Sequence, residues 1–282
     1  MGCNAVLKTT ETSLRLLDDE AKRVASGMAS FRNERVDRLC GPSTPSGRQI
    51  TSSDSQEPSR TNGNIGFSPF YYYPFLFVSA FPSVAVEDLR TLALANRILL
   101  EAILLSDKKI DETRPWTPAD FYLVDSYFHK ALEMLIPLFP LEHVFWQKTQ
   151  GWFLQHGRAI IKEQLRHRHR LCPYTQEEFF EVSTGKVALI KTNLLAMALL
   201  TDTSDVLAPL MESQDRFLTG FQCFDDLRDW KEDLRQGNFT FLLTRVLFAG
   251  GLDAHVRRGD PVPRDEAGQV LYHRGIAEGQ LP

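Results

Sequence analysis

The segment from residue 212 to residue 236 constrains the fold more than any other part of the sequence. It contains no proline and only one glycine, Gly220, so it favours one long helix. Residues four apart lie on the same side of a helix, about 6 Å apart along its axis. The spacing therefore predicts a ridge of acids, made of Asp225, Asp229 and Asp233 and flanked by Asp226 and Glu232.

The helix face beside this ridge is apolar. Its residues are Phe217, Phe221, Phe224, Leu227, Trp230 and Leu234. Carboxylates at this spacing repel one another unless a cation neutralises them. Hard oxygen ligands on a rigid helix suit Mg²⁺, which keeps several waters and usually shares its coordination shell with substrate phosphates. Taken alone, acids four apart more often form a solvated helix edge, and this is the alternative for the ridge.

A second acidic group follows an earlier helix. Apolar residues fill most positions from 84 to 106, which is typical of a helix in the middle of a helical domain. The acids come where that helix ends: Asp107, Asp111 and Glu112. Arg114-Pro115 stops the helix, and Thr117-Pro118-Ala119-Asp120 is typical of the start of the next one. The chain therefore has two acidic groups on helices, separated by helical sequence.

The two groups resemble the aspartate-rich motifs of the class I isoprenoid synthases, which include the terpene synthases. Phe221-Gln222 followed by Asp225-Asp226-x-x-Asp229 is similar to the second motif of prenyl diphosphate synthases. Leu227-Arg228-Asp229 with Glu232-Asp233 and Gly237 is equally similar to the second motif of squalene and phytoene synthases. Asp107-x-x-x-Asp111-Glu112 resembles the first motif of that latter group. The resemblance covers residues 70–248, and two motifs in the right order are a fairly specific signal.

The resemblance implies an all-α bundle of helices around a central cavity, and an enzyme that acts on a prenyl diphosphate with more than one Mg²⁺ ion. It implies these metal ligands: Asp107, Asp111, Glu112, Asp225, Asp226, Asp229 and Asp233. Among them, the acids expected to be essential for catalysis are Asp107, Asp111, Asp225 and Asp229. Arg228 and Lys231 are expected to bind the diphosphate, and Phe221 to contact the substrate.

The segment from residue 175 to residue 200 gives a further expectation. Gly185 and the Ser-Thr pair before it weaken the helix in its middle. In class I isoprenoid synthases, a break at this point turns backbone carbonyls toward the cavity, and a nearby lysine meets the diphosphate. By resemblance Lys186 or Lys191 has that role, and the spacing does not choose between them. A glycine at a tight helix crossing explains Gly185 equally well.

The composition of the chain argues against some classes of binding partner and of cellular location. The chain has 282 residues, 43% of them hydrophobic, and a formal net charge of −4, so it lacks the basic excess of a nucleic-acid-binding protein. Its four scattered cysteines, without a CxxC motif, are typical of reduced thiols in a cytoplasmic protein. No apolar run reaches the roughly 18 residues of a membrane span. A homodimer is left open.

Three parts are expected along the chain. Residues 1–66 combine an amphipathic helix over 11–39 with a disordered loop over 41–66, which is rich in Ser, Pro and Gly. Residues 67–250 are the helical core, and residues 251–282 a polar tail. Within the core, the aromatic run 67–77 is either a plug that covers the bundle or a wall facing a carbocation. The basic run 166–170 is expected to be a solvated helix C-terminus.

We therefore expect a terpene synthase that ionises and cyclises one prenyl diphosphate, releases pyrophosphate and gives a terpene hydrocarbon or alcohol. The alternative within the class is a squalene- or phytoene-type transferase that joins two prenyl chains. A third interpretation is a non-catalytic helical module that binds a prenyl diphosphate or a protein helix. Lys108-Lys109 favours that interpretation, because this pair replaces an acid found in many first motifs.

Overall fold

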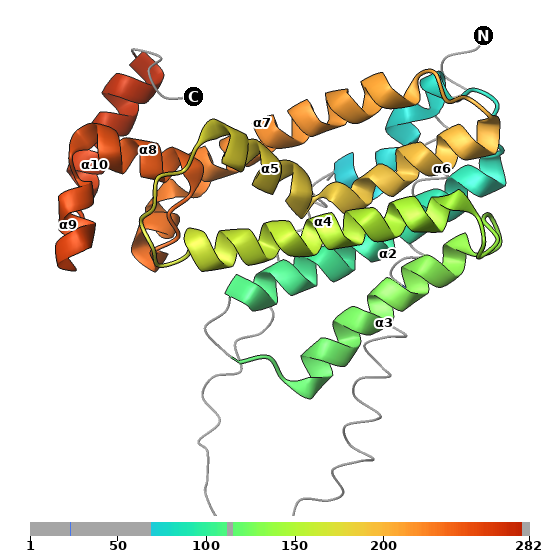
Figure 1. Ribbon diagram of the computed structural model, residues 1–282, viewed down its shortest axis with the longest axis horizontal. Coiled ribbons are helices and arrows are strands. Elements are labelled where there is room, and N and C mark those ends of the chain that lie inside the picture. Colours follow the sequence, from blue (N-terminus) through green and yellow to red (C-terminus); the bar gives the residue numbers. More distant parts are fainter. Residues whose placement is uncertain (1–22, 24–68, 112–114, 278–282) are drawn as a thin grey trace, which may run out of the picture. The chain divides into compact units, whose positions relative to one another are not determined.

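The computed structural model describes residue 23 and residues 69–111 and 115–277 (Figure 1). Glu112, the predicted loop over 41–66 and, apart from Arg23, the predicted helix over 11–39 lie outside the described residues. Every regular element of the described part is a helix, and that part contains no β-strand. The prediction of an all-α fold class is thus confirmed. Among the described helices, none combines the length and the apolar character that a bilayer crossing requires.

The chain divides into two compact units. The first contains the described residues up to Leu141 together with Leu199–Asp202, and the second contains Glu142–Ala198 and the described residues from Thr203 onward. The predicted core over residues 67–250 therefore contributes to both units.

The first unit is built on one long apolar helix. Its elements are η1 (Pro69–Ala80), α2 (Val86–Asp111) and α3 (Pro118–Leu135), and α2 packs against both of the others. The described part of the aromatic run, residues 69–77, lies in η1, a 3₁₀ segment whose helical path is interrupted at Tyr72. Asn96 of α2 fixes η1 by donating a 2.7 Å hydrogen bond to the carbonyl of Phe70. Tyr73 is buried, with its ring edge-on to Phe77 at 5.0 Å.

The start of α3 follows the expected capping chemistry. Thr117 Oγ1 accepts a 3.2 Å hydrogen bond from the Asp120 backbone N–H, and Asp120 Oδ2 accepts a 3.1 Å bond from the Thr117 N–H. This reciprocal pair satisfies two donors that the first helical turn leaves unpaired. Lys109, near the end of α2, lies 3.5 Å from Asp120 Oδ1 and so ties the two helices together.

The second unit contains the remaining helices. They are α4 (Val144–Arg166), α5 (Gln176–Lys186), η2 (Ala188–Ile190), α6 (Lys191–Thr201, of which Leu199–Thr201 belong to the first unit), α7 (Leu207–Gln236), α8 (Phe241–Gly250), α9 (Asp253–Arg258), α10 (Arg264–Val270) and the π-helical η3 (Leu271–Ala277). Within this unit α4 packs against α5 and η2, α5 packs against α7, and α7 packs against α8.

The predicted weak point after Gly185 is a real interruption. α5 ends at Lys186, Val187 leaves helical geometry with φ −115° and ψ 16°, and the short η2 leads into α6. The glycine also permits a close helix crossing, because a Cβ at this position would lie 2.6 Å from the Cβ of Ala159 on α4. The tight helix crossing is thus confirmed, and so is the interruption of the helix, whereas the role of this break in a cavity stays a prediction.

α7 is the single long helix that the sequence predicts. It ends at Gly237, whose φ of 74° is the left-handed conformation that glycine adopts without a steric penalty. The Asn238 N–H then donates a 2.9 Å hydrogen bond to the Asp233 carbonyl, which closes the helix end. Thr240 begins α8 by accepting a hydrogen bond from the Leu243 N–H.

The segment after Gly251 differs from the polar tail that we expected. It forms α9, α10 and η3, and α9 and α10 pack against α8 (Figure 1). Its apolar residues are few and widely spaced, yet Leu252, Ala267 and Leu271 are buried in one hydrophobic cluster with Leu247 of α8. Composition hides this packing because glycine, proline and charged residues separate the buried positions.

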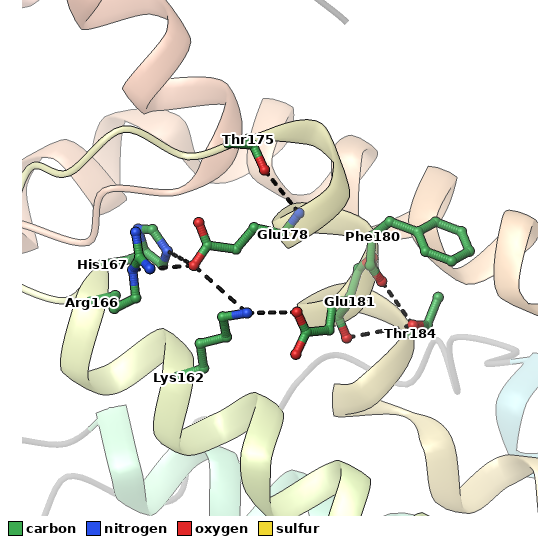
Figure 2. A network of polar contacts seen from close by, with 9 residues as sticks. Lys162, Arg166, His167, Thr175, Glu178, Phe180, Glu181 and Thr184 are labelled. Atoms are coloured by element: carbon green, nitrogen blue, oxygen red, sulfur yellow. Dashed lines mark hydrogen bonds and ion pairs between the residues drawn. The ribbon is translucent and has the colours of Figure 1, made fainter.

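The basic run 166–170 is not wholly solvated, so that expectation is wrong for His167. The His167 side chain is buried and stacks on the Tyr174 ring with 3.6 Å between ring centroids. A buried acid, Glu178, lies next to this histidine. Its Oε1 is 3.2 Å from Arg166 Nε and 3.5 Å from His167 Nε2 (Figure 2). A carboxylate from the first turn of α5 therefore keeps part of this run inside the unit.

Candidate functional site

The acids of α7 have two different settings. Asp225 and Asp229, called here the outer acid pair, are half-exposed and share one guanidinium. Arg228 Nη2 lies 2.6 Å from Asp225 Oδ1 and 2.7 Å from Asp229 Oδ2. The hydrogen bond from Arg228 lowers the pKa of Asp229. Arg228 thus holds Asp229 in its ionised form and, through its contact with both acids, balances part of the charge of the outer acid pair.

Asp226 and Asp233, called here the inner acid pair, are seven residues apart on another side of α7. Asp226 is 3% exposed and accepts a 2.9 Å hydrogen bond from Gln222 Nε2. Burial raises the pKa of Asp226 to about 6. Burial, reinforced by the charge of Asp226, raises the pKa of Asp233 to about 7. The predicted ridge thus contains both ionised and partly protonated carboxyl groups near neutral pH.

Asp226 also lies close to the start of α8. The backbone N–H of Leu242, in the first turn of α8, lowers the pKa of Asp226 against the effect of burial. A negative charge near this helix start favours the N-terminal end of the helix dipole.

Polar contacts continue along the inner side of α7 toward α5 and α6. Lys191 is 7% exposed, and its Nζ lies 2.6 Å from Asp215 Oδ1. The hydroxyl groups of Ser183 and Thr219 form a 3.2 Å hydrogen bond. We call the set Ser183, Lys186, Lys191, Asp215, Thr219, Asp226 and Asp233 the inner seam.

The two candidate lysines both lie in this seam, on either side of the break between α5 and α6. Lys186 Nζ lies 3.0 Å from Glu163 Oε2 of α4, and its charge lowers the pKa of Asp226 against the effect of burial. Lys191 is paired with Asp215. Each lysine therefore has a carboxylate partner inside the unit. To bind a phosphate, each would have to leave that carboxylate.

Sequence reasoning missed Glu163 and Asp215, the partners of these lysines. A signal for Asp215 was present, because eleven residues are close to three helical turns. The spacing from Asp215 to Asp226 therefore places both acids on one side of α7. Glu163 lies on a different helix, and no local spacing in the sequence connects it with Lys186.

The outer side of α7 carries exposed aromatic rings. Phe217, Phe221 and Phe224 are 51%, 42% and 59% exposed, and the first two rings lie 6.4 Å apart. Lys231 follows on the same helix, with its Nζ 5.5 Å from the centroid of the Trp230 ring. Aromatic rings of this size are usually buried, so a row of them on the surface marks a binding surface. This row, the outer aromatic row, lies beside the outer acid pair.

The first acidic group lies in the other unit. Asp107 occurs in the last turns of α2, is half-exposed and forms no ion pair with any described residue. Asp111 is the last residue of α2, and Glu112 lies outside the described residues. Lys109 lies between the two aspartates in the sequence. It has a structural role, because it pairs with Asp120. The prediction that these acids hold metal stays a prediction.

The donor chemistry of α7 fits Mg²⁺. Within residues 69–111 and 115–277 no three His, Cys, Asp or Glu side chains form a group that could hold a metal ion by themselves. Mg²⁺ does not require such a group, because it commonly takes one or two carboxylates and completes its shell with water and substrate phosphates. Two pairs of aspartates, one of them with pKa values raised mainly by burial, are suitable hard oxygen ligands.

Neither a protein-family model nor a curated protein matches this chain. A functional assignment therefore depends on the acids of α7, the outer aromatic row and the inner seam themselves.

Proposed function

We propose that the chain is a Mg²⁺-dependent class I isoprenoid synthase, in which a prenyl diphosphate is ionised and pyrophosphate is released, as in a terpene synthase. One observation carries the proposal: the outer acid pair and the outer aromatic row occur side by side on α7. A prenyl diphosphate has the matching composition, because a strongly anionic head is joined to a long apolar tail. Acids alone or exposed rings alone would each have a simpler explanation.

The head of the substrate requires cations. The residues that would hold Mg²⁺ on α7 are Asp225, Asp229 and Asp233, with Asp226 close behind them. Bound Mg²⁺ would supply Lewis-acid stabilisation of the leaving pyrophosphate. Arg228 is exposed, so its guanidinium can leave the outer acid pair and bind phosphate oxygens bidentately, while Lys231 adds a point charge.

The tail of the substrate requires protection from water. Phe217, Phe221 and Phe224 offer apolar surface that can pack against isoprene units and exclude solvent from the reacting carbon. The faces of these rings also carry a negative quadrupole, which stabilises a nearby cation. The outer aromatic row thus accounts for the second half of the chemistry, in which a carbocation forms and rearranges.

The test is pyrophosphate release from geranyl, farnesyl and geranylgeranyl diphosphates, each with and without Mg²⁺. We expect Mg²⁺-dependent release from at least one substrate, and a loss of at least about 100-fold in kcat for Asp107→Ala and for Asp229→Ala, because each removes a metal ligand. Glu232→Ala is the matched control, since Glu232 is an exposed acid of α7 that is paired with Arg235. Full activity of Asp229→Ala, or equal losses in all three variants, would contradict the proposal.

The products decide between the two reactions of the class. A hydrocarbon or alcohol with the carbon number of the substrate indicates a terpene synthase, and a doubled carbon number indicates a prenyl-joining transferase. We favour the first, because the outer aromatic row provides a surface for one chain and for the rearrangement of its cation.

A non-catalytic binding module is the second candidate, and Arg228 favours it. Its guanidinium balances Asp225 and Asp229 without a metal ion. In that case the chain would bind a prenyl diphosphate, and Mg²⁺ would not change the affinity. Retained binding with no pyrophosphate release from any of the three substrates would select this function.

A further inference from the structure

A separate pocket of about 420 Å³ lies within the second unit. Its walls come from α8, from η3 and from the segment just before α5, and they include Pro173, Tyr174, Thr244, Arg245, Phe248 and Arg274. None of the α7 acids is among its lining residues. The volume is within the range of sites for small organic molecules, which is about 300–1,000 Å³.

The charge of this pocket is positive. Both charged side chains that line it are arginines, Arg245 and Arg274, and both are exposed. Within the described residues neither one is paired with a carboxylate. Arg245 lies 5.9 Å from the centroid of the Phe241 ring, and Arg274 Nη1 donates to the carbonyl of Ala249. A guanidinium has five N–H donors in a planar fork, so most donors of the two arginines are left for a ligand.

One wall of the pocket is apolar and held rigidly. The Tyr174 ring stacks on His167 with 7° between the ring planes, and it meets the Phe241 ring edge-on at 5.7 Å. Behind this ring, Glu178 Oε1 lies 3.5 Å from His167 Nε2 (Figure 2). Glu178 is itself fixed at the start of α5, because its backbone N–H donates a 3.1 Å hydrogen bond to Thr175 Oγ1. A wall fixed in this way loses little freedom when a ligand binds.

We propose that this pocket binds a small organic anion, whose oxyanion group contacts Arg245 and Arg274 and whose flat apolar body packs against Tyr174 and Phe248. Two guanidinium groups, with no carboxylate among the described residues that line the pocket, select a carboxylate or a phosphate, since both oxyanions accept bidentate hydrogen bonds. The aromatic side chains select a ring or another flat apolar group. The site is independent of the proposed catalytic function, because it shares none of the residues assigned to the prenyl diphosphate.

Isothermal titration calorimetry on the full chain tests the site, with phenyl phosphate, benzoate and inorganic phosphate as probes. Phenyl phosphate and benzoate should bind, and inorganic phosphate should bind at least about tenfold more weakly than phenyl phosphate because it lacks the ring. Arg245→Gln should weaken phenyl phosphate at least about tenfold, since it removes a charge-assisted hydrogen bond. Arg257→Gln, which changes an exposed arginine of α9 paired with Asp253, is the matched control and should bind as the parent does.

Two further variants keep the test decisive. Arg274→Lys retains the positive charge near the end of α8 but loses the planar fork, so it should bind phenyl phosphate more weakly while keeping the helical circular dichroism of the parent. Asp229→Ala should bind phenyl phosphate with the parent's affinity. Equal affinity of the parent, Arg245→Gln and Arg274→Lys would overturn the proposal, as would the absence of binding for phenyl phosphate and benzoate. Loss of binding in Asp229→Ala would also overturn it, because the ligand would then occupy α7.

Discussion

On the outer side of α7, Asp225 and Asp229 are half-exposed and share the guanidinium of Arg228, whereas on the inner side Asp226 and Asp233 are packed into the unit with raised pKa values. All four acids belong to one short stretch of sequence. Their chemistry differs because burial disfavours a charged carboxylate, while an exposed arginine favours it. The side of the helix on which an aspartate falls therefore decides whether it is ionised before any ligand arrives.

The same contrast holds for the cations. Arg228 lies in water and is able to exchange partners at little cost, because exposed ion pairs contribute little to stability. Lys186 and Lys191 lie in the inner seam with Glu163 and Asp215 as partners. A diphosphate that approaches from the outer side thus meets an available arginine, and one that reaches the inner seam must compete with existing ion pairs.

The largest expected effect comes from breaking an ion pair of the inner seam. Lys191→Met leaves the Asp215 carboxylate with no partner in a mostly buried position, and we expect a loss of about 2–4 kcal/mol in the free energy of unfolding. Urea denaturation measures it. Arg216→Met, which breaks the exposed pair with Glu212 on the same helix, should cost no more than about 1 kcal/mol. Equal losses in the two variants would show that the inner seam is no less solvated than the surface.

Two glycines give the next comparison. Gly185→Ala places a methyl group 2.6 Å from Ala159 Cβ, and this overpacking should cost about 1–3 kcal/mol even after the gain in helix propensity. Gly220→Ala adds a methyl group to α7 where no atom lies within 4 Å, so it should stabilise the protein by about 0.5–1 kcal/mol. The midpoint of thermal unfolding should therefore fall in the first variant and rise in the second. A rise in both would mean that α4 and α5 can separate without cost.

The pH dependence of stability should have opposite signs for the two acid pairs. Burial raises the folded-state pKa of Asp233 to about 7, well above that of a carboxyl group in the unfolded chain, so its charge destabilises the fold as the pH rises from about 4 to 7. Asp233→Asn removes that penalty and should raise the free energy of unfolding at pH 8 by about 1–2 kcal/mol, with no gain at pH 3.

Asp229 should behave in the reverse way. Arg228 lowers its folded-state pKa, so the ionised carboxylate stabilises the fold above the unfolded-state pKa and this contribution is lost as the pH falls. Asp229→Asn should therefore lower stability slightly at pH 7 and not at pH 2. Denaturation curves of both variants between pH 2 and pH 8 measure the difference. A gain at pH 8 from Asp229→Asn, or a loss there from Asp233→Asn, would reverse the assignment of outer and inner pairs.

The smallest effect on stability is expected for Arg228→Ala. The exposed guanidinium should contribute no more than about 1 kcal/mol to folding, measured by urea denaturation. Its effect on function should be much larger, because this exposed arginine can exchange its carboxylate partners for a phosphate. A raised KM for the prenyl diphosphate with unchanged stability would agree with this role. A loss of stability greater than about 2 kcal/mol would instead make Arg228 a structural residue.

The sequence was sufficient for the local elements. The absence of proline from residue 212 to residue 236 indicated that this part of α7 is one helix. Thr117 and Asp120 indicated the start of α3, and Gly185 marked the break between α5 and α6. Each of these features depends on interactions within a few residues along the chain, and such interactions can be read from spacing and side-chain chemistry.

The rotation of α7 about its own axis could not be read in this way. Spacing shows which acids share a side of a helix, but the partner helices decide which side is buried. Asp226 is buried beside α8, whose Leu242 N–H lowers its pKa, and His167 is buried beside Glu178 of α5. Both partners come from other elements. The packing of Ala267 and Leu271 against α8 could not be read from the sequence either. The apolar residues of the segment after Gly251 are separated by charged and turn-forming positions, so no local pattern marks them as buried.

The most direct test of the central claim is a calorimetric titration of Mg²⁺ into the protein in the presence of pyrophosphate. If the acids of α7 serve a cation, the parent and Glu232→Ala should bind Mg²⁺ alike, and Asp229→Ala should bind it at least about tenfold more weakly because one carboxylate ligand is missing. Binding of Mg²⁺ by Asp229→Ala with the parent's affinity would contradict the claim and leave these acids as a helix surface balanced by Arg228.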